Sequence, residues 1–248
     1  MTEPNTILPE HVDWQRHAIF LDFDGTLTPI VDRPEDVVVG ERTRRALSRL
    51  GDLTDGALAV ISGRALADLE RHLAPMVCAM SGSHGLEIRQ PGCDGKLLAD
   101  AEAILKPVLE EISAFAARND LLVENKPGAV TVHYRGRPEM ADACRALVDR
   151  IAGDQEPLRA MHGNMVSEVA LAGIDKGAAL ENFMNEIPFR GRTPIMAGDD
   201  VTDEDAFRAA RALDGFGIKI GPGPTVAAYR AADIDAFLAW LSRQTDLQ

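Results

Sequence analysis

Two carboxylates directly follow an apolar run near the start of the chain. The run Ile19–Leu21 leads into Asp22 and Asp24, and Gly25 with Thr26 then interrupts it. This pattern predicts a buried strand that ends in an acidic turn, which is where open α/β sheets bind their ligands. Two carboxylates held this close repel each other unless a cation lies between them. The pair therefore indicates a divalent metal site, and its oxygen ligands suit Mg²⁺.

Three further groups of polar residues follow predicted strands or begin predicted helices. They are Ser62 with Arg64, Lys176, and Asp199 with Asp200 and Asp203. The carboxyl ends of parallel strands converge on one crevice, so we expect these groups to meet Asp22 and Asp24 there. Each group alone has a structural interpretation as a capping turn, an ordinary turn, a solvated lysine or an acidic helix N-terminus. Their occurrence at successive strand ends favours one shared site.

The chemistry that these groups suit is phosphoryl transfer. One carboxylate can attack phosphorus and form an aspartyl-phosphate. A second can protonate the leaving alcohol and then take a proton from the water that hydrolyses this intermediate. Mg²⁺ would offset the repulsion between the attacking carboxylate and the phosphate. A lysine and a hydroxyl can neutralise the charge on the other phosphoryl oxygens.

Strands alternate with amphipathic helices in the first and last parts of the chain. Predicted strands cover residues 18–22, 57–61, 77–80, 193–197 and 216–220. Helical spacing of apolar side chains predicts helices within residues 40–53 and 66–73, another from Lys176 with Asp175 as its cap, and a last one near residues 236–241. This order predicts an α/β fold with a Rossmann-like parallel sheet and right-handed crossovers.

The middle of the chain has a different pattern, and a turn-rich segment at residues 91–95 precedes it. Its predicted elements are helices at about 101–117 and 138–151, an antiparallel hairpin formed by LLVENK and AVTVHYR, and short strands near 158–161 and 165–170. We therefore expect a core of residues 1–102 and 173–248, with residues 103–172 inserted as an α+β cap domain.

The motif DFDGT, the strand-end serine, the lysine and GDDVTD together resemble the four signature motifs of the haloacid dehalogenase (HAD) superfamily of phosphotransferases. The resemblance implies a HAD core in which Asp22 is the nucleophile and Asp24 is the general acid/base. It also implies that Ser62 and Lys176 hold the phosphoryl group. The implied Mg²⁺ ligands are Asp22, the carbonyl of Asp24 and Asp199, with Asp200 and Asp203 acting through water or as supports.

A narrower resemblance covers nearly the whole chain. The segments LDFDGTLTPI, ISGR, GSHGLE, ENK followed by HYR, and GDDVTDEDAF resemble the trehalose-6-phosphate phosphatase family. The resemblance implies that the cap reads a disaccharide through Glu124, Lys126 and Glu168. Glu124 and Lys126 are two positions apart, so they share a strand face, where an ion pair on a solvated sheet is the alternative interpretation. The sequence departs from the family at Ala170 and Leu171, where a basic residue and a proline are usual.

Two other residues are candidates for substrate contact. Arg64 lies two positions after Ser62 and can meet the phosphate or a sugar oxygen, or it can serve on the surface. His84 lies on a glycine-flanked loop at a strand end, where it can contact substrate or stabilise the loop through a hydrogen bond.

We therefore expect a Mg²⁺-dependent hydrolase that converts trehalose 6-phosphate and water to trehalose and phosphate. The nearest alternative is a HAD phosphatase for another sugar phosphate, such as sucrose 6-phosphate or a glycosyl-phosphoglycerate. An alternative from another class is a non-catalytic phospho-acceptor or sensor, because receiver domains also combine acidic residues, a lysine and Mg²⁺. Such a domain would be much shorter and would lack the inserted unit.

Composition excludes several kinds of partner. The 248 residues are 46% apolar and 26% charged, which is ordinary globular composition, and the net charge is −13. That charge argues against nucleic acid or an anionic membrane surface as the main partner. The cysteines Cys78, Cys93 and Cys144 lack metal-ligand spacing, as expected of reduced thiols in the cytoplasm. We expect a cytoplasmic protein with a small-molecule substrate and, as a default for the oligomeric state, a monomer.

Overall fold

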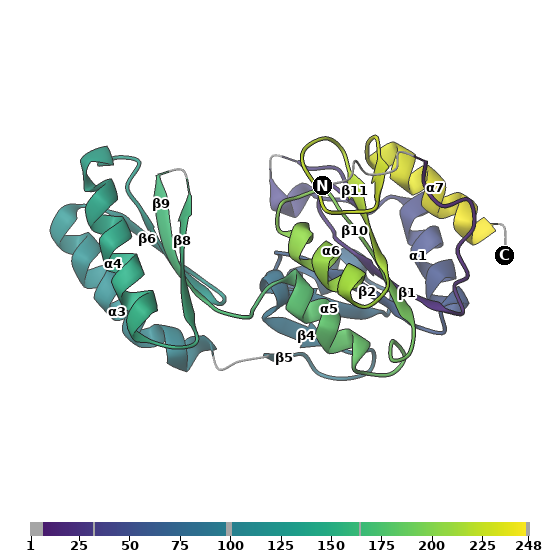
Figure 1. Ribbon diagram of the computed structural model, residues 1–248, viewed down its shortest axis with the longest axis horizontal. Helices are drawn as coiled ribbons and strands as arrows, with labels where there is room; N and C mark the ends of the chain where they lie inside the picture. Colours follow the sequence, from purple (N-terminus) through teal and green to yellow (C-terminus); the bar gives the residue numbers. More distant parts are fainter. Residues whose placement is uncertain (1–6, 32, 98–100, 164, 247–248) are drawn as a thin grey trace. The chain divides into compact units, whose positions relative to one another are not determined.

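The computed structural model describes residues 7–31, 33–97, 101–163 and 165–246 (Figure 1). The chain divides into two units, one joining Met1–Lys96 to Asp175–Gln248 and the other formed by Leu97–Ile174. Each unit has a sheet of its own, apart from strand β5, which crosses the boundary. None of the described helices is long and apolar enough to cross a membrane.

The first unit is built on an eight-stranded sheet in the order β12-β11-β10-β1-β2-β3-β4-β5. Its strands are β1 (His17–Leu21), β2 (Leu58–Ile61), β3 (Ala79–Gly82), β4 (Glu87–Arg89), β5 (Lys96–Leu97), β10 (Thr193–Gly198), β11 (Phe216–Ile220) and β12 (Tyr229–Ala231). β1 pairs in parallel with both β2 and β10, and later strands extend the sheet in opposite directions from this centre. The carboxyl ends of β1 and β10 therefore border the crevice where such sheets bind ligands.

The predicted parallel α/β core is present, but the sheet differs from the prediction in three respects. β4 runs antiparallel to β3, so the sheet is mixed at this edge. β3 begins two residues later than predicted, because Val77 is 72% exposed whereas all four residues of Ala79–Gly82 are buried. β4, β5 and β12 have only two or three residues each, which is too short for an alternating pattern to reveal them.

Helices cover both faces of this sheet. They are α1 (Glu41–Leu53), α2 (Leu66–Leu73), α5 (Lys176–Met184), α6 (Asp203–Ala212) and α7 (Ile234–Asp246). One hydrophobic cluster joins Ile19 and Leu21 of β1 to α1, α2 and α7. Between them in sequence, the Phe20 ring packs against Phe183 of α5 and against Phe189, at centroid distances of 6.2 and 5.4 Å. Because side chains alternate along a strand, α5 and the adjoining α6 cover the opposite face (Figure 1).

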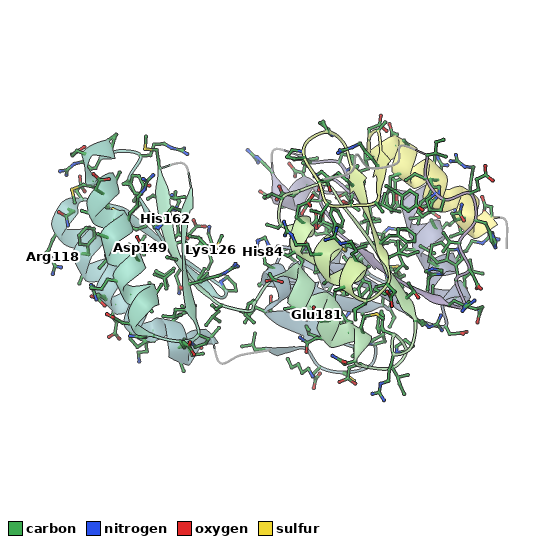
Figure 2. The ribbon with its side chains drawn as sticks, viewed as in Figure 1. His84, Arg118, Lys126, Asp149, His162 and Glu181 are labelled. Atoms are coloured by element: carbon green, nitrogen blue, oxygen red, sulfur yellow. The ribbon has the colours of Figure 1, made fainter. Side chains whose placement is uncertain are left out.

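The second unit is a four-stranded antiparallel sheet, in the order β6-β7-β9-β8, with two helices. Its elements are α3 (Ala101–Asn119), β6 (Leu122–Lys126), β7 (Ala129–His133), α4 (Ala141–Asp154), β8 (Leu158–Gly163) and β9 (Val166–Leu171). His162 of β8 bonds to Asp149 of α4 at 3.0 Å, which identifies the face that α4 covers (Figure 2). Ser167 is paired with His162, so the next residue, Glu168, points to the opposite, open face.

Candidate active site

A pocket of about 560 Å³ lies in the first unit where β1, β2 and β10 end. Its lining contains eight of the residues selected from the sequence, namely Asp22, Asp24, Ser62, Arg64, His84, Lys176, Asp199 and Asp200. Ile30, Val31, Gly63 and Thr202 complete it. Strand ends and the start of α5 thus bring residues from five separate segments into one cavity, as expected at the carboxyl edge of a doubly wound sheet.

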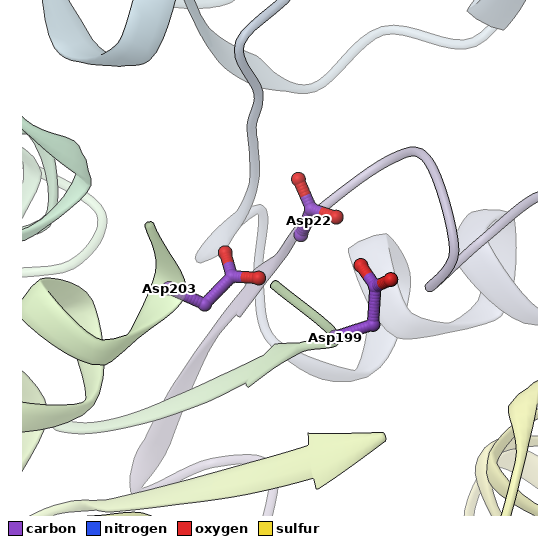
Figure 3. A group of neighbouring side chains, drawn as sticks. All are labelled: Asp22, Asp199 and Asp203. Carbon is purple, nitrogen blue, oxygen red and sulfur yellow. The ribbon is translucent and has the colours of Figure 1, made fainter. Parts of the chain in front are cut away.

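Three carboxylates face one another at this site (Figure 3). One oxygen each from Asp22, Asp199 and Asp203 lies within 4.8 Å of the others, a separation that a single cation could bridge. Burial, reinforced by the charge of Asp203, raises the pKa of Asp22 to about 7 against the opposing effect of Lys176. Burial and the charges of Asp203 and Asp200 also raise the pKa of Asp199. The cluster therefore resists holding its full negative charge without a cation.

Lys176 supplies one positive charge to this cluster. Its Nζ donates to Asp22 Oδ1 and to Asp203 Oδ1, both at 2.7 Å, and its side chain is 3% exposed. Burial opposes the charge of Lys176, but the two carboxylates outweigh it and raise the pKa of the amine. The side chain of Asp175 caps α5 by accepting from Ala178 N at 2.9 Å, which fixes the first turn that carries Lys176.

Asp203 is held on both sides. Its Oδ1 accepts from Lys176, and its Oδ2 accepts from the backbone N of Asp200 at 2.9 Å. Because both oxygens already have partners, Asp203 orients Lys176 and the turn after β10. Asp22 and Asp199 are better placed to hold a metal directly.

Gly25 allows Asp199 to approach the turn that follows β1. Its φ is +76°, in the left-handed region that favours glycine, and a Cβ at this position would lie 2.2 Å from Asp199 Oδ2. No larger residue fits this contact without moving the carboxylate. The glycine of the DFDGT motif is therefore required by the geometry of the acidic cluster.

Asp24 lies in the same pocket but outside the three-carboxylate cluster. Arg64 Nε donates to its Oδ2 at 2.6 Å and a terminal nitrogen donates to its Oδ1 at 2.8 Å, a bidentate ion pair. Arg64 also donates to Asp68 Oδ2 at 2.6 Å and lies 5.3 Å from the centroid of the Phe23 ring. Arg64 therefore fixes the orientation of the carboxyl group predicted to act as acid and base.

Ser62 and His84 also line the pocket. The Ser62 side chain is buried, and its Oγ accepts from Arg64 N at 3.2 Å, which closes the turn after β2. His84 is exposed and packs next to Gly63, where a Cβ would lie 2.5 Å from the imidazole Cε1. The predicted contacts of both residues with substrate remain predictions.

In the second unit, the three residues predicted to read a sugar form a polar network on the open face of the sheet. Lys126 Nζ lies 3.4 Å from Glu124 and 3.6 Å from Glu168. Thr131 Oγ1 donates to Glu168 Oε2, and His133 Nε2 lies 3.0 Å from Glu124 Oε2. The same-face ion pair considered from the sequence is thus formed. A role in sugar binding remains a prediction.

Lys219 is a charged residue at this site that the sequence pattern did not reveal as functional. It is 5% exposed on β11, and its Nζ donates to the backbone carbonyl of Asp199. Lysine is rarely buried without a polar partner, so its position within the apolar run FGIKI was an available signal. Thr202, Ile30 and Val31 also line the pocket, but no residue type or spacing marked them.

Comparison with solved structures establishes the class of fold. A haloacid dehalogenase-like hydrolase from B. subtilis matches 93% of this chain and 99% of its own with a TM-score of 0.64 at 12% identity, which shows the fold alone. Aspergillus fumigatus trehalose-6-phosphate phosphatase matches with a TM-score of 0.78 at 27% identity, over 95% of this chain and 96% of its own. The HAD-like fold predicted from the motifs is confirmed.

Sequence comparison narrows this class. The profile described as trehalose-phosphatase matches residues 20–235. Trehalose-6-phosphate phosphatase of Escherichia coli K12 is 36% identical over 246 residues, covering 99% of this chain and 92% of that relative. A probable trehalose-phosphate phosphatase of Sinorhizobium fredii is 36% identical over 213 residues, covering 85% and 80%. The chain belongs to the trehalose-phosphatase family, whose named members are phosphoric monoester hydrolases, and the resemblance drawn from its motifs is confirmed.

Proposed function

We propose that this protein hydrolyses trehalose 6-phosphate to trehalose and phosphate, with Asp22 as nucleophile and Mg²⁺ as its metal. The names of the E. coli and S. fredii relatives support this choice of substrate. The observation that carries the reaction is the meeting of Asp22, Lys176 and Asp199 in one pocket at the centre of the parallel sheet. We place the protein in the cytoplasm, acting as a monomer and without a nucleic-acid partner, as the sequence led us to expect.

The acidic cluster fits a divalent metal. Its donors are all carboxylate oxygens, which suit Mg²⁺, and Asp22 with Asp199 would hold the ion while Asp203 supports them. When bound, Mg²⁺ supplies positive charge that offsets the repulsion between the Asp22 carboxylate and the incoming phosphate. Lys176 adds a fixed positive charge that contacts the same carboxylate.

The first half of the reaction transfers the phosphoryl group to the protein. An Asp22 oxygen attacks phosphorus, the bond from phosphorus to the sugar oxygen breaks, and Asp24 gives its proton to that oxygen. Trehalose leaves, and an aspartyl-phosphate remains. In the structure Arg64 donates to both oxygens of Asp24, the arrangement of a carboxylate, so this ion pair must loosen and Asp24 must take up a proton before it can deliver one.

The second half regenerates the protein. Asp24, now a carboxylate, takes a proton from water while the water oxygen bonds to phosphorus, and the bond to Asp22 breaks. Phosphate leaves with the water oxygen. The Ser62 hydroxyl and Lys176 are suited to neutralise charge on the other phosphoryl oxygens in both steps.

Recognition of the sugar is assigned to the open face of the second unit. Glu124 and Glu168 offer acceptors, and Lys126 between them offers donors. Such a fixed alternation of charges complements the hydroxyl groups of a disaccharide. We place residues 103–172 in the cap domain that carries this function.

The decisive experiment is a phosphate-release screen over several sugar phosphates and p-nitrophenyl phosphate, with Mg²⁺ or with a chelator. We expect trehalose 6-phosphate to be the best substrate, chelation to abolish turnover, and Asp22→Asn to lower kcat by at least about 10³-fold without unfolding. Equal rates on all sugar phosphates would refute the assignment of trehalose 6-phosphate as the substrate. Near-normal turnover by Asp22→Asn would refute the assignment of Asp22 as the nucleophile.

A further inference from the structure

The segment GSHGLE contains a backbone conformation that needs external support. Ser83 and His84 have φ of +50° and +55°, so two consecutive residues with side chains occupy the left-handed region. This region is unfavourable for both, because their Cβ atoms crowd the backbone. Strained residues of this kind persist only where surrounding contacts hold them, and they concentrate at functional sites.

Glu87 of β4 supplies much of that support. Its Oε2 accepts from Ser83 Oγ at 2.6 Å and from Leu66 N, in the first turn of α2, at 3.0 Å. A single carboxylate oxygen thereby joins the strained turn to the start of a helix. The backbone completes the attachment, because Ser83 N donates to Arg64 O at 2.7 Å and His84 N donates to Ser62 O at 3.0 Å.

These bonds attach the turn to the loop that carries Ser62 and Arg64. The turn also lies against the start of α5, since a Cβ at Gly85 would lie 2.4 Å from the carbonyl oxygen of Asp175. The turn presents the exposed imidazole of His84, which lies beside Gly63 and lines the pocket. A solvent-exposed side chain does not stabilise a core, so burial of His84 does not account for the strain.

We propose that Glu87 is a positioning residue, which acts through Ser83 to hold the His84 imidazole where it hydrogen-bonds an oxygen of the sugar phosphate. This inference rests on the proposed function and adds a substrate contact with the device that fixes it. Glu87 itself touches no substrate. Its effect on catalysis is transmitted by the turn and by the Ser62–Arg64 loop.

The chain offers a matched control for this role. Arg89 of β4 forms an ion pair with Glu70 of α2 at 2.7 Å, so Glu70 also joins β4 to α2. Unlike Glu87, Glu70 has no bond to Ser83 or to the loop at residues 62–64 among the described contacts. Replacing either glutamate removes a β4–α2 link, but only Glu87 should affect the pocket.

The test compares Glu87→Met, Glu87→Gln and Glu70→Met, using whichever sugar phosphate the wild type hydrolyses best. We expect Glu87→Met to raise KM about tenfold with a smaller change in kcat, because His84 then loses its hydrogen bond to the charged sugar phosphate. Glu87→Gln keeps an acceptor oxygen and should restore most of the affinity. Glu70→Met should change the melting temperature but not KM.

His84→Ala provides the second arm. We expect it to raise KM to a similar extent, and Glu87→Met to add little in the His84→Ala background, because both changes remove the same contact. Additive losses, or an unchanged KM in folded Glu87→Met, would overturn the proposal. If Glu87→Met does not fold, a wild-type KM for His84→Ala would overturn it equally. A wild type inactive on every sugar phosphate would instead refute the proposed function, before any variant is compared.

Discussion

Lys176→Met tests the electrostatic design of the site most directly. The substitution keeps an apolar side chain of similar length but removes a buried charge bonded to Asp22 and Asp203 at 2.7 Å each. Breaking a buried ion pair by removing one partner costs about 3–5 kcal/mol, because the remaining charge is left uncompensated. At about 2–4 °C per kcal/mol for a unit of this size, we expect the melting temperature to fall by about 6–20 °C in chelator.

The assay is thermal unfolding of the wild type and the variant, in chelator and again with Mg²⁺. Mg²⁺ should reduce the difference in melting temperature between the wild type and the variant. A bound cation relieves the same repulsion among the carboxylates and stabilises only the folded form. Lys106→Met, at an exposed position on α3, is the control and should leave the melting temperature unchanged. Adding Asp203→Asn to Lys176→Met should recover part of the loss. A folded Lys176→Met with the melting temperature of the wild type in chelator would refute the reasoning.

Three other perturbations address the pH response, the sugar contact and the acidic turn. Burial raises the pKa of Asp22 from 3.8 to about 7, so this group should lower the stability of the metal-free protein as pH rises through that window and add no further loss above it. The raised pKa of Asp199 adds a loss of the same sign. Asp22→Asn should therefore show a smaller decrease of melting temperature with pH than the wild type, and an identical decrease would contradict the prediction. Lys126→Ala should raise KM for trehalose 6-phosphate about tenfold but leave p-nitrophenyl phosphate hydrolysis unchanged, and equal losses would count against sugar recognition. Gly25→Ala should weaken Mg²⁺ binding about 10–100-fold by calorimetry, because its Cβ would displace Asp199. Gly92→Ala, with φ of +75° but open space around it, is the control and should bind Mg²⁺ normally.

The position of the pocket could be predicted because it depends on strand order. Asp22 follows β1 and Asp199 follows β10, and these strands are neighbours at the centre of the sheet. Once the alternation of strands and helices indicates a doubly wound sheet, residues at these two ends must lie close together. Lys176 could be added because Asp175 marks the start of its helix.

The partners of individual side chains could not be predicted in the same way. Arg64 was expected to meet phosphate, a sugar oxygen or solvent, whereas its guanidinium pairs with Asp24 and Asp68. That choice depends on rotamers and on the Phe23 ring beneath the guanidinium, and no pattern in the sequence specifies either. Asp203 was expected either to bind Mg²⁺ through water or to support the other ligands. Its hydrogen bonds with Lys176 and with the backbone of Asp200 favour the supporting role.

The insertion re-enters the first unit at Asp175, and this junction is firmly anchored. Asp175 Oδ1 accepts from Ala178 N at 2.9 Å, its carbonyl accepts from Ala179 N at 3.1 Å, and Gly85 packs against that carbonyl. Just before it, Gly173 has φ of +71°. The contacts of Asp175 with Ala178, Ala179 and Gly85 all lie within the first unit, so that unit by itself fixes the helix start that carries Lys176. The positive charge beside Asp22 is therefore held in place from within the first unit.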